Sequence, residues 1–167
     1  PAELMPGARS VVVCGVSYKN DTSLGYGDTA VPKVASYARS GDYHVAVKEM
    51  LYETAARLGL KEDGTGFRAF TDTAPLLEKR LACEAGLGFI GRNTLLVSPR
   101  YGSFLLLGEL VVDVPVDTYD RPYEGIGCGA CRRCVEHCPA GALTGEGLDA
   151  RRCISRLTVE PHPERVP

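Results

Sequence analysis

Hydrophobic positions along the chain recur with two different periods, which separate strands from helices. Three successive valines mark 10–16 as a strand, and its apolar, β-branched character predicts that both of its faces are covered. The clearest helical period runs over 42–59, where Asp42 can cap the start and Gly59 can end it. The apolar face of this helix is expected to consist of Val47, Met50, Leu51, Thr54 and Leu58.

Two further helices are predicted, one on each side of this one. A loop and then a helix are expected over 25–41, with a proline near the first helical turn and a glycine just past the end. The other helix is expected over 72–86, opened by Asp72 or Thr73 and closed by a glycine.

Short strands complete the pattern. One is predicted within 66–72, and a glycine-rich turn followed by strands at 94–97 and 103–112 comes after the last helix. The resulting order, β-α-α-β-α-β-β, predicts an α/β (α+β) architecture with helices packed on one sheet.

Composition changes this picture only after Pro115, where a segment rich in proline, glycine and aspartate begins. We therefore expect a larger domain over 1–116 and a small cysteine-rich module over 117–167. The chain has 167 residues, a net charge of −2 and no apolar run of about 18 residues, which predicts a globular monomer outside the membrane. The lack of a charged-then-apolar leader favours a cytoplasmic location. The acidic balance argues against a tight grip on many nucleic-acid phosphates.

Four cysteines of the module lie close together, and a proline follows the last of them: Cys128, Cys131, Cys134 and Cys138. This spacing, C-x2-C-x2-C-x3-C-P, is the run of bacterial ferredoxins, in which the fourth cysteine ligates a different cluster from the first three. Zinc sites normally use two separated CxxC pairs, and disulfide frameworks are typical of secreted chains. The module is therefore predicted to hold 4Fe–4S iron, with structural zinc or disulfides as alternatives.

The chain contains too few cysteines for two complete clusters. Cys153 is the natural companion of Cys138, so the module offers five of the eight thiolates that two clusters need. Two interpretations stay open: a further cysteine run in a longer protein supplies the other three, or the chain holds one cluster through the first three thiols and one of these two. Cys14 and Cys83 fall in strand and helix patterns and are interpreted as small buried hydrophobic residues.

Two long stretches outside the cysteine run carry a resemblance to a known family. They are DTAPLLEKRLACEAGLGFIGRNTLLVSPRYGSFLLLGEL at 72–110 and LDARRCISRLTVE at 148–160. Together with LMPGARSVVV and GDYH, they closely resemble epoxyqueuosine reductase, the cobalamin-dependent iron–sulfur enzyme of tRNA queuosine synthesis. The resemblance runs in order from about Leu4 to Glu160. Members of that family are longer, with a segment before LMPGARS and a second cysteine run after the CIS motif.

The resemblance implies a complete reaction. Two 4Fe–4S clusters feed electrons from an external donor to cobalamin, and the epoxide of epoxyqueuosine in the tRNA anticodon loop is reduced to give queuosine. An acid protonates the departing oxygen, and in the family this acid is the aspartate of the DT-x-P motif, which is Asp72 here. From the residues alone, an aspartate before a proline-containing first turn is better interpreted as a helix cap than as a catalytic acid.

The resemblance also implies a cobalamin pocket. The DYH motif places Tyr43 and His44 in that pocket, although a lone histidine is more often an ordinary surface or core residue. Leu96, Ser98 and Ser155 are further expected cofactor contacts. The nearby stretch GLGFIGRN lacks the dinucleotide-binding and Walker spacings. Its glycines are expected to permit a tight turn and the close approach of a large flat cofactor.

Basic residues form two sets that favour either a solvated surface or contact with the tRNA backbone. The sets are Lys79, Arg80, Arg92 and Arg100, and Arg132, Arg133, Arg151, Arg152 and Arg156.

Two other functions remain as alternatives to epoxyqueuosine reduction. One is a ferredoxin-like electron-transfer module without substrate chemistry of its own. The other is a related corrinoid reductase that acts on a small molecule. The long match outside the cysteines argues against the first alternative. The DT-x-P aspartate argues against the second, whose members use a tyrosine as the acid.

Overall fold

The computed structural model describes residues 1–19, 34–61 and 66–159. Its main sheet has three antiparallel strands in the order β1-β5-β2, formed by Ser10–Ser17, Leu105–Val112 and Phe67–Phe70. β5 lies in the middle and pairs along its whole length with β1, from Ser10 opposite Val112 to Ser17 opposite Leu105. A separate hairpin joins β3 (Phe89–Ile90) to β4 (Leu96–Val97).

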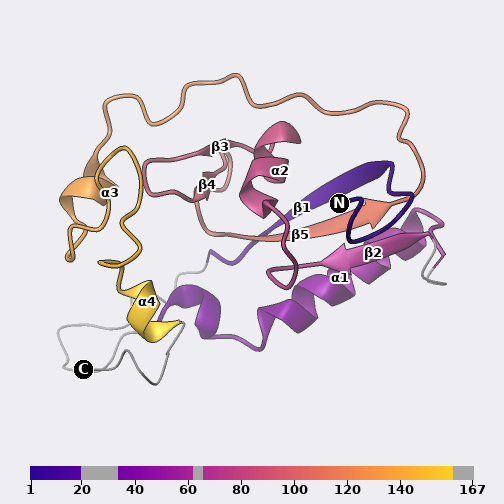
Figure 1. Cartoon of the computed structure of the whole chain (residues 1–167), viewed down its shortest axis with the longest axis horizontal. Helices are drawn as coiled ribbons and strands as arrows, with labels where there is room; N and C mark the ends of the chain where they lie inside the picture. The colour runs from indigo at the N-terminus through magenta and orange to yellow at the C-terminus, as the bar shows by residue number, and fades with distance from the viewer. Residues whose placement is uncertain (20–33, 62–65, 160–167) are drawn as a thin grey trace.

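Helix α1, Tyr43–Arg57, covers one face of this sheet (Figure 1). The side chain of Asp42 accepts a hydrogen bond from the backbone N–H of His44 and so caps the first turn. Gly59, at φ +70°, follows the last turn in the left-handed conformation that glycine adopts freely. The helix and the sheet share one buried cluster, which consists of Val47, Leu51, Ala55, Phe67, Leu110 and Val112.

The opposite face of the sheet carries α2, Glu78–Glu84, so that the two helices lie on either side of the strands (Figure 1). Val111 of β5 is fully buried there together with Phe70 and Met5. Ala74 and Leu76, from the loop before α2, pack against this second cluster. Alternate residues of β5 therefore serve two different cores, as the pleat of a strand requires.

The cysteine-rich module lies at one end of the molecule, reached by a long segment without helix or strand after β5 (Figure 1). It contains two single-turn helices, α3 (Arg133–Glu136) and α4 (Ser155–Thr158), and a bridge that pairs Leu143 with Leu148. The composition change after Pro115 thus coincides with a change from regular secondary structure to short turns.

The strands predicted over 10–16, within 66–72 and over 103–112 are present, and so is the strand at the end of 94–97. β1 is half-buried rather than covered on both faces, and it lies at the edge of the sheet with β5 as its partner. The mixed helix and sheet architecture is confirmed.

The predicted helices agree less well with the structure than the predicted strands do. Of the one expected over 25–41, the described residues form only a 3-10 turn, Ser36–Ala38, and Pro32 lies outside them. The ring of Tyr37 contacts those of Tyr18 and Tyr43, with centroids 6.5 and 6.1 Å apart, so tertiary packing sets this segment.

The apolar face predicted for α1 is partly wrong. Val47 and Leu51 are buried, but Met50 and Leu58 are 49% and 58% exposed, and Ala55 takes the buried position instead. A four-residue spacing stacks Val47, Leu51 and Ala55 on one line facing the sheet, which is narrower than the expected stripe.

The free thiols outside the module are half-buried, not fully buried. Cys14 packs against the core under α1, and burial raises the pKa of its thiol; Cys83 on α2 shows the same direction and cause. No helix within the described ranges has the length and apolar character needed to cross a membrane.

Candidate functional site

Asp72 lies in the loop between β2 and α2, with its side chain exposed and its backbone at φ +50°. Few residues other than glycine adopt this left-handed conformation. α2 begins only at Glu78, so the prediction that Asp72 or Thr73 caps this helix is wrong. The residue before Pro75 is disfavoured in a helix, which explains the delayed start.

Two contacts hold Asp72 in place. Its carboxylate oxygen Oδ2 accepts a hydrogen bond from the Tyr43 hydroxyl at 2.7 Å. Its backbone N–H donates to Oε1 of Glu78 at 2.6 Å. The preceding residue, Thr71, is fully buried and donates from Oγ1 to the carbonyl of Leu107 on β5 at 2.7 Å. The loop is therefore tied to both helices and to the middle strand.

Tyr43 and His44 stand at the first turn of α1, beside this loop. Their rings stack with centroids 4.0 Å apart, and Nδ1 of His44 lies 2.8 Å from Oδ1 of Asp42. Burial, and then the hydrogen bond to Asp72, raise the pKa of Tyr43, so its hydroxyl stays protonated and donates. Hydrogen bonds from His44 lower the pKa of Asp42. The structure thus brings Tyr43 and Asp72, predicted separately, into direct contact.

Three aromatic residues that sequence reasoning missed extend this corner: Tyr18, Tyr37 and Phe104. The ring of Tyr18 lies 6.5 Å from that of Tyr37 and 5.5 Å from that of Phe104, while Tyr37 reaches Tyr43 at 6.1 Å. Phe104 is 42% exposed. Tyr18 follows β1, Tyr37 lies within the 3-10 turn and Phe104 precedes β5, and no local pattern in the sequence signals that they meet.

The other three residues expected in the cobalamin pocket, Leu96, Ser98 and Ser155, do not lie in the Asp72 loop or at the first turn of α1. Leu96 and Ser98 are buried around β4, and Ser98 Oγ accepts a hydrogen bond from the N–H of Arg100. Ser155 opens α4 and is exposed. A hollow lined by Leu148, Ala150, Arg151, Cys153, Ser155, Arg156 and Val159 brings Ser155 and Cys153 to one surface.

The glycines of GLGFIGRN serve the hairpin. A Cβ at Gly88 would lie 2.2 Å from the carbonyl oxygen of Val97, so only glycine allows β3 and β4 to approach this closely. A Cβ at Gly91 would meet Val97 and Asn93 side-chain atoms below 3 Å and would stand 3.6 Å from Sγ of Cys128. These two glycines therefore permit close approach within the chain itself, and this extends to the cysteine module. The expected approach of a flat cofactor stays a prediction.

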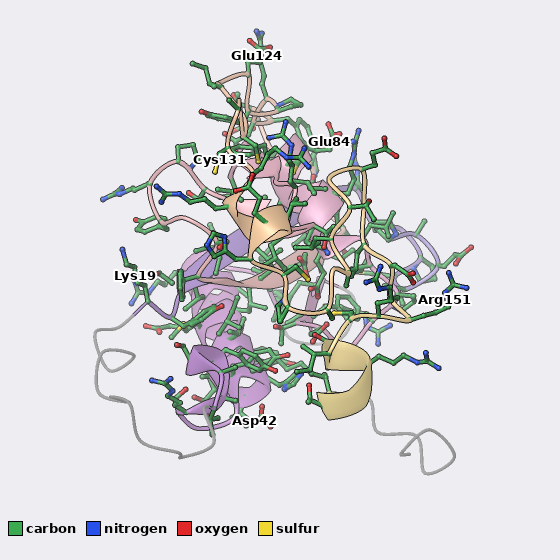
Figure 2. All side chains as sticks on the ribbon, turned by 90° about the vertical axis from the view of Figure 1, so that its left-hand side faces the viewer. Lys19, Asp42, Glu84, Glu124, Cys131 and Arg151 are labelled. Atoms are coloured by element: carbon green, nitrogen blue, oxygen red, sulfur yellow. The ribbon has the colours of Figure 1, made fainter. Side chains whose placement is uncertain are left out.

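Arg92 connects this hairpin to the module. Its backbone N–H donates to Sγ of Cys128 at 3.4 Å, and its guanidinium Nη1 donates to the carbonyls of Gly129 and Cys131, each at 2.8 Å. Cys131 is exposed and lies well away from Asp42 at the α1 end of the molecule (Figure 2). One arginine thus fixes the backbone of the first CxxC turn.

Cys138 is surrounded by backbone amides of the turn that follows Pro139. The N–H of Ala142 donates to its Sγ at 3.3 Å, and amide hydrogen bonds, led by that of Leu143, lower the pKa of this thiol. A lowered pKa favours the thiolate that binds metal. Among the described residues, no three His, Cys, Asp or Glu side chains converge as a ligand set, so the fit to iron rests on donor chemistry: soft thiols with N–H···S bonds.

Several members of the two basic sets have local partners, as the solvated-surface interpretation predicts. Lys79 Nζ donates to the carbonyl of Thr94 at 2.8 Å, and Arg80 pairs with Glu84. Arg151 pairs with Asp149.

Comparisons with known proteins agree with this arrangement. Residues 1–73 match the family model described as epoxyqueuosine reductase QueG, DUF1730, and residues 127–165 match a 4Fe-4S double cluster binding domain. An epoxyqueuosine reductase from Pseudomonas aeruginosa is 43% identical over 165 residues, which cover 96% of this chain and 45% of that protein. The chain spans about half the length of the curated relatives it matches.

Solved structures give the same result. The epoxyqueuosine reductase of Streptococcus thermophilus superposes with a TM-score of 0.82 at 32% identity, covering 97% of this chain and 44% of that one. A crystal structure of epoxyqueuosine reductase with a tRNA-Tyr epoxyqueuosine-modified tRNA stem loop matches with a TM-score of 0.76 at 31% identity, over 94% of this chain and 42% of that one.

Proposed function

The chain belongs to the epoxyqueuosine reductase family, and on that premise we propose that it forms part of an enzyme that reduces epoxyqueuosine to queuosine in tRNA. The observation that carries the proposal is the contact between Tyr43 and Asp72. It joins the DYH and DT-x-P motifs, which lie far apart in the sequence, at one exposed corner. The related crystal structure with an epoxyqueuosine-modified tRNA-Tyr stem loop supports a tRNA stem loop as the substrate.

Asp72 supplies the acid of the proposed reaction. The departing epoxide oxygen needs a proton, and a carboxyl group on an exposed loop is able to reach a substrate held above it. The Tyr43 hydroxyl donates a hydrogen bond to Oδ2 at 2.7 Å and so restricts the rotation of the Asp72 carboxyl group. Because the hydroxyl stays protonated, it donates throughout and does not compete as the acid.

Two cofactor sites are part of the proposal. Cobalamin, when bound, supplies the reducing cobalt centre, and 4Fe–4S clusters deliver its electrons. The aromatic corner formed by Tyr18, Tyr37, Tyr43 and Phe104 offers ring faces that fit a large conjugated cofactor. His44 extends the corner by stacking on Tyr43, and Ser155 shares a surface with Cys153.

The five cysteines Cys128, Cys131, Cys134, Cys138 and Cys153 are proposed as the ligands that this chain contributes to two clusters. Residues 127–165 match the family model of a 4Fe-4S double cluster binding domain, which supports two clusters rather than one. Residues 1–116 then form the cobalamin-binding part and residues 117–167 the cluster module.

The test uses the complete enzyme, reconstituted without oxygen with iron, sulfide and cobalamin, and tRNA that carries epoxyqueuosine. Nucleoside mass spectrometry after reduction is expected to show queuosine. Electron transfer to an acceptor without any loss of epoxyqueuosine would favour a ferredoxin-like module. Dehalogenation of a small halide with no conversion of tRNA would favour the other corrinoid reductase.

A further inference from the structure

Glu109 is the least expected side chain of the core. It lies at the centre of β5, opposite Val13 of β1 and Phe70 of β2, and is fully buried. Within the described part of the chain, neither of its carboxyl oxygens accepts a hydrogen bond from an N–H or hydroxyl group. An ionised carboxylate in that position lacks compensation, which costs several kcal/mol. Glu109 is therefore protonated.

The carboxyl group that acts on Glu109 is that of Glu78, the first residue of α2. Burial raises the pKa of both carboxyl groups, and the charge of Glu78 raises the pKa of Glu109 further. Two neighbouring carboxylates resist being ionised together, so the pair holds one proton. The other titratable groups that interact with the pair are Cys14 on β1, Tyr43 and His44 on α1, and Asp72.

The pair leads directly to Asp72. Oε1 of Glu78 accepts a hydrogen bond from the backbone N–H of Asp72 at 2.6 Å. Asp72 has a φ of +50°, and this hydrogen bond stabilises its left-handed conformation. The contact is to the backbone and not to the Asp72 carboxyl group, so it positions that group and does not pass it a proton. Thr71 ties the same turn to β5 through Leu107.

We propose that Glu78 and Glu109 form a proton-sharing carboxyl pair whose role is to hold the Asp72 turn, so that the Asp72 carboxyl group faces Tyr43. Both are positioning residues for the acid, an inference that rests on the proposed function of Asp72. A purely structural core favours a hydrophobic residue at position 109, because a well-packed apolar side chain avoids the burial of a carboxyl group. The pair instead connects the centre of the sheet to the reactive loop.

The first test measures the turn itself in the complete reconstituted enzyme. Hydrogen exchange with mass spectrometry, resolved to the Asp72 amide, compares the parent with Glu78→Ala, Glu109→Leu and Glu109→Gln. Glu78→Ala removes the acceptor and is expected to speed exchange at least about ten-fold, as the loss of a hydrogen bond to a charged group predicts. Glu109→Leu should do the same through Glu78, while Glu109→Gln, which keeps a donor, should restore most of the protection.

Glu84→Gln is the matched control, because Glu84 lies on the exposed side of the same helix and pairs with Arg80. It should leave exchange at Asp72 unchanged. Unchanged exchange in Glu78→Ala would overturn the proposal, and it does not depend on whether Glu109→Leu folds. Acceleration by Glu84→Gln equal to that by Glu78→Ala would also overturn it.

Turnover on epoxyqueuosine tRNA gives the second readout. Glu78→Ala is expected to lower kcat with little change in KM for tRNA. The parent should lose Asp72 protection, corrected for intrinsic exchange, as pH rises through about 8, where Glu109 ionises, and Glu109→Gln should remove this step. A step that persists in Glu109→Gln would refute the pair. Full turnover in Asp72→Asn would refute the proposed acid alone, since the exchange results stand without it.

Discussion

Replacing Glu109 with glutamine is expected to make the chain more stable at neutral pH. Burial, followed by the charge of Glu78, raises the pKa of Glu109 from its ordinary 4.5 to about 8. The unfolded chain therefore releases this proton near pH 4.5, while the folded chain keeps it until about pH 8. The contribution of the Glu109 proton to the free energy of unfolding is complete below pH 4.5. It is lost as the pH rises from 4.5 toward about 8.

The size of the effect follows from these two values. Each pH unit between them costs about 1.4 kcal/mol of unfolding free energy. The loss therefore reaches about 3 kcal/mol at pH 7 and roughly 4 to 5 kcal/mol at pH 8. Glutamine keeps the size of the side chain and a hydrogen-bond donor but has no proton to lose. Parent and Glu109→Gln should then differ by less than about 1 kcal/mol at pH 5, and the variant should lead by about 3 kcal/mol at pH 7.

Urea unfolding followed by far-ultraviolet circular dichroism, repeated from pH 5 to pH 8.5, measures this difference. Taking the difference between the two proteins cancels the titration of every group that does not interact with Glu109. Glu84→Gln should follow the parent at each pH. Parallel curves for the parent and Glu109→Gln would mean that Glu109 is ionised in the folded chain, which would refute the reasoning.

Four further changes test other parts of the structure. Gly88→Ala forces a Cβ to within 2.2 Å of the Val97 carbonyl, and we expect a loss of more than about 2 kcal/mol in urea unfolding. Leu110→Ala opens a cavity in the core under α1 and should cost about 2 to 5 kcal/mol in the same assay. Arg92→Ala removes the two bonds to the CxxC turn, so iron should be lost faster to a chelator, measured by visible absorbance, with Arg100→Ala as the control. Tyr43→Phe removes the hydrogen bond to the Asp72 carboxyl group and should lower the single-turnover rate constant about ten-fold or more. An unchanged rate constant would exclude an orienting role for Tyr43.

Local sequence rules succeed where a segment depends on its own residues. The valines of β1 and the period of α1, with Asp42 at its start and Gly59 after its end, are enough to locate these elements. The same rules fail at α2, which begins at Glu78 because the left-handed turn at Asp72 and the following proline delay it. They fail again at Tyr37, whose segment is set by contacts with other aromatic rings.

The site follows the same division. The cysteine run is visible as a spacing, so candidate cluster ligands are predicted from the residues themselves. The role of Asp72 as the acid is expected only from the resemblance of the DT-x-P motif to epoxyqueuosine reductase. The Glu78–Glu109 pair is invisible there, because Glu109 stands within an apolar strand pattern and Glu78 resembles an ordinary helix residue. Only the pairing of β5 with β2 places Glu109 opposite Phe70, shortly before the Asp72 turn, and only the hydrogen bond from the Asp72 N–H links Glu78 to that turn. The role of Arg92 likewise cannot be read from the sequence, because it depends on the hydrogen bond from the hairpin to the cysteine module.

We propose Asp72 as the group that supplies the proton in epoxyqueuosine reduction. The most direct measurement is a single turnover of the complete, cofactor-loaded enzyme on epoxyqueuosine tRNA, with queuosine quantified by nucleoside mass spectrometry. Asp72→Asn is compared with Asp117→Asn, an exposed aspartate in the segment after β5. If Asp72 is the acid, both variants should show normal cofactor spectra, Asp117→Asn should convert the tRNA normally, and Asp72→Asn should lose at least about a hundred-fold in rate. Equal conversion by the two variants would contradict it.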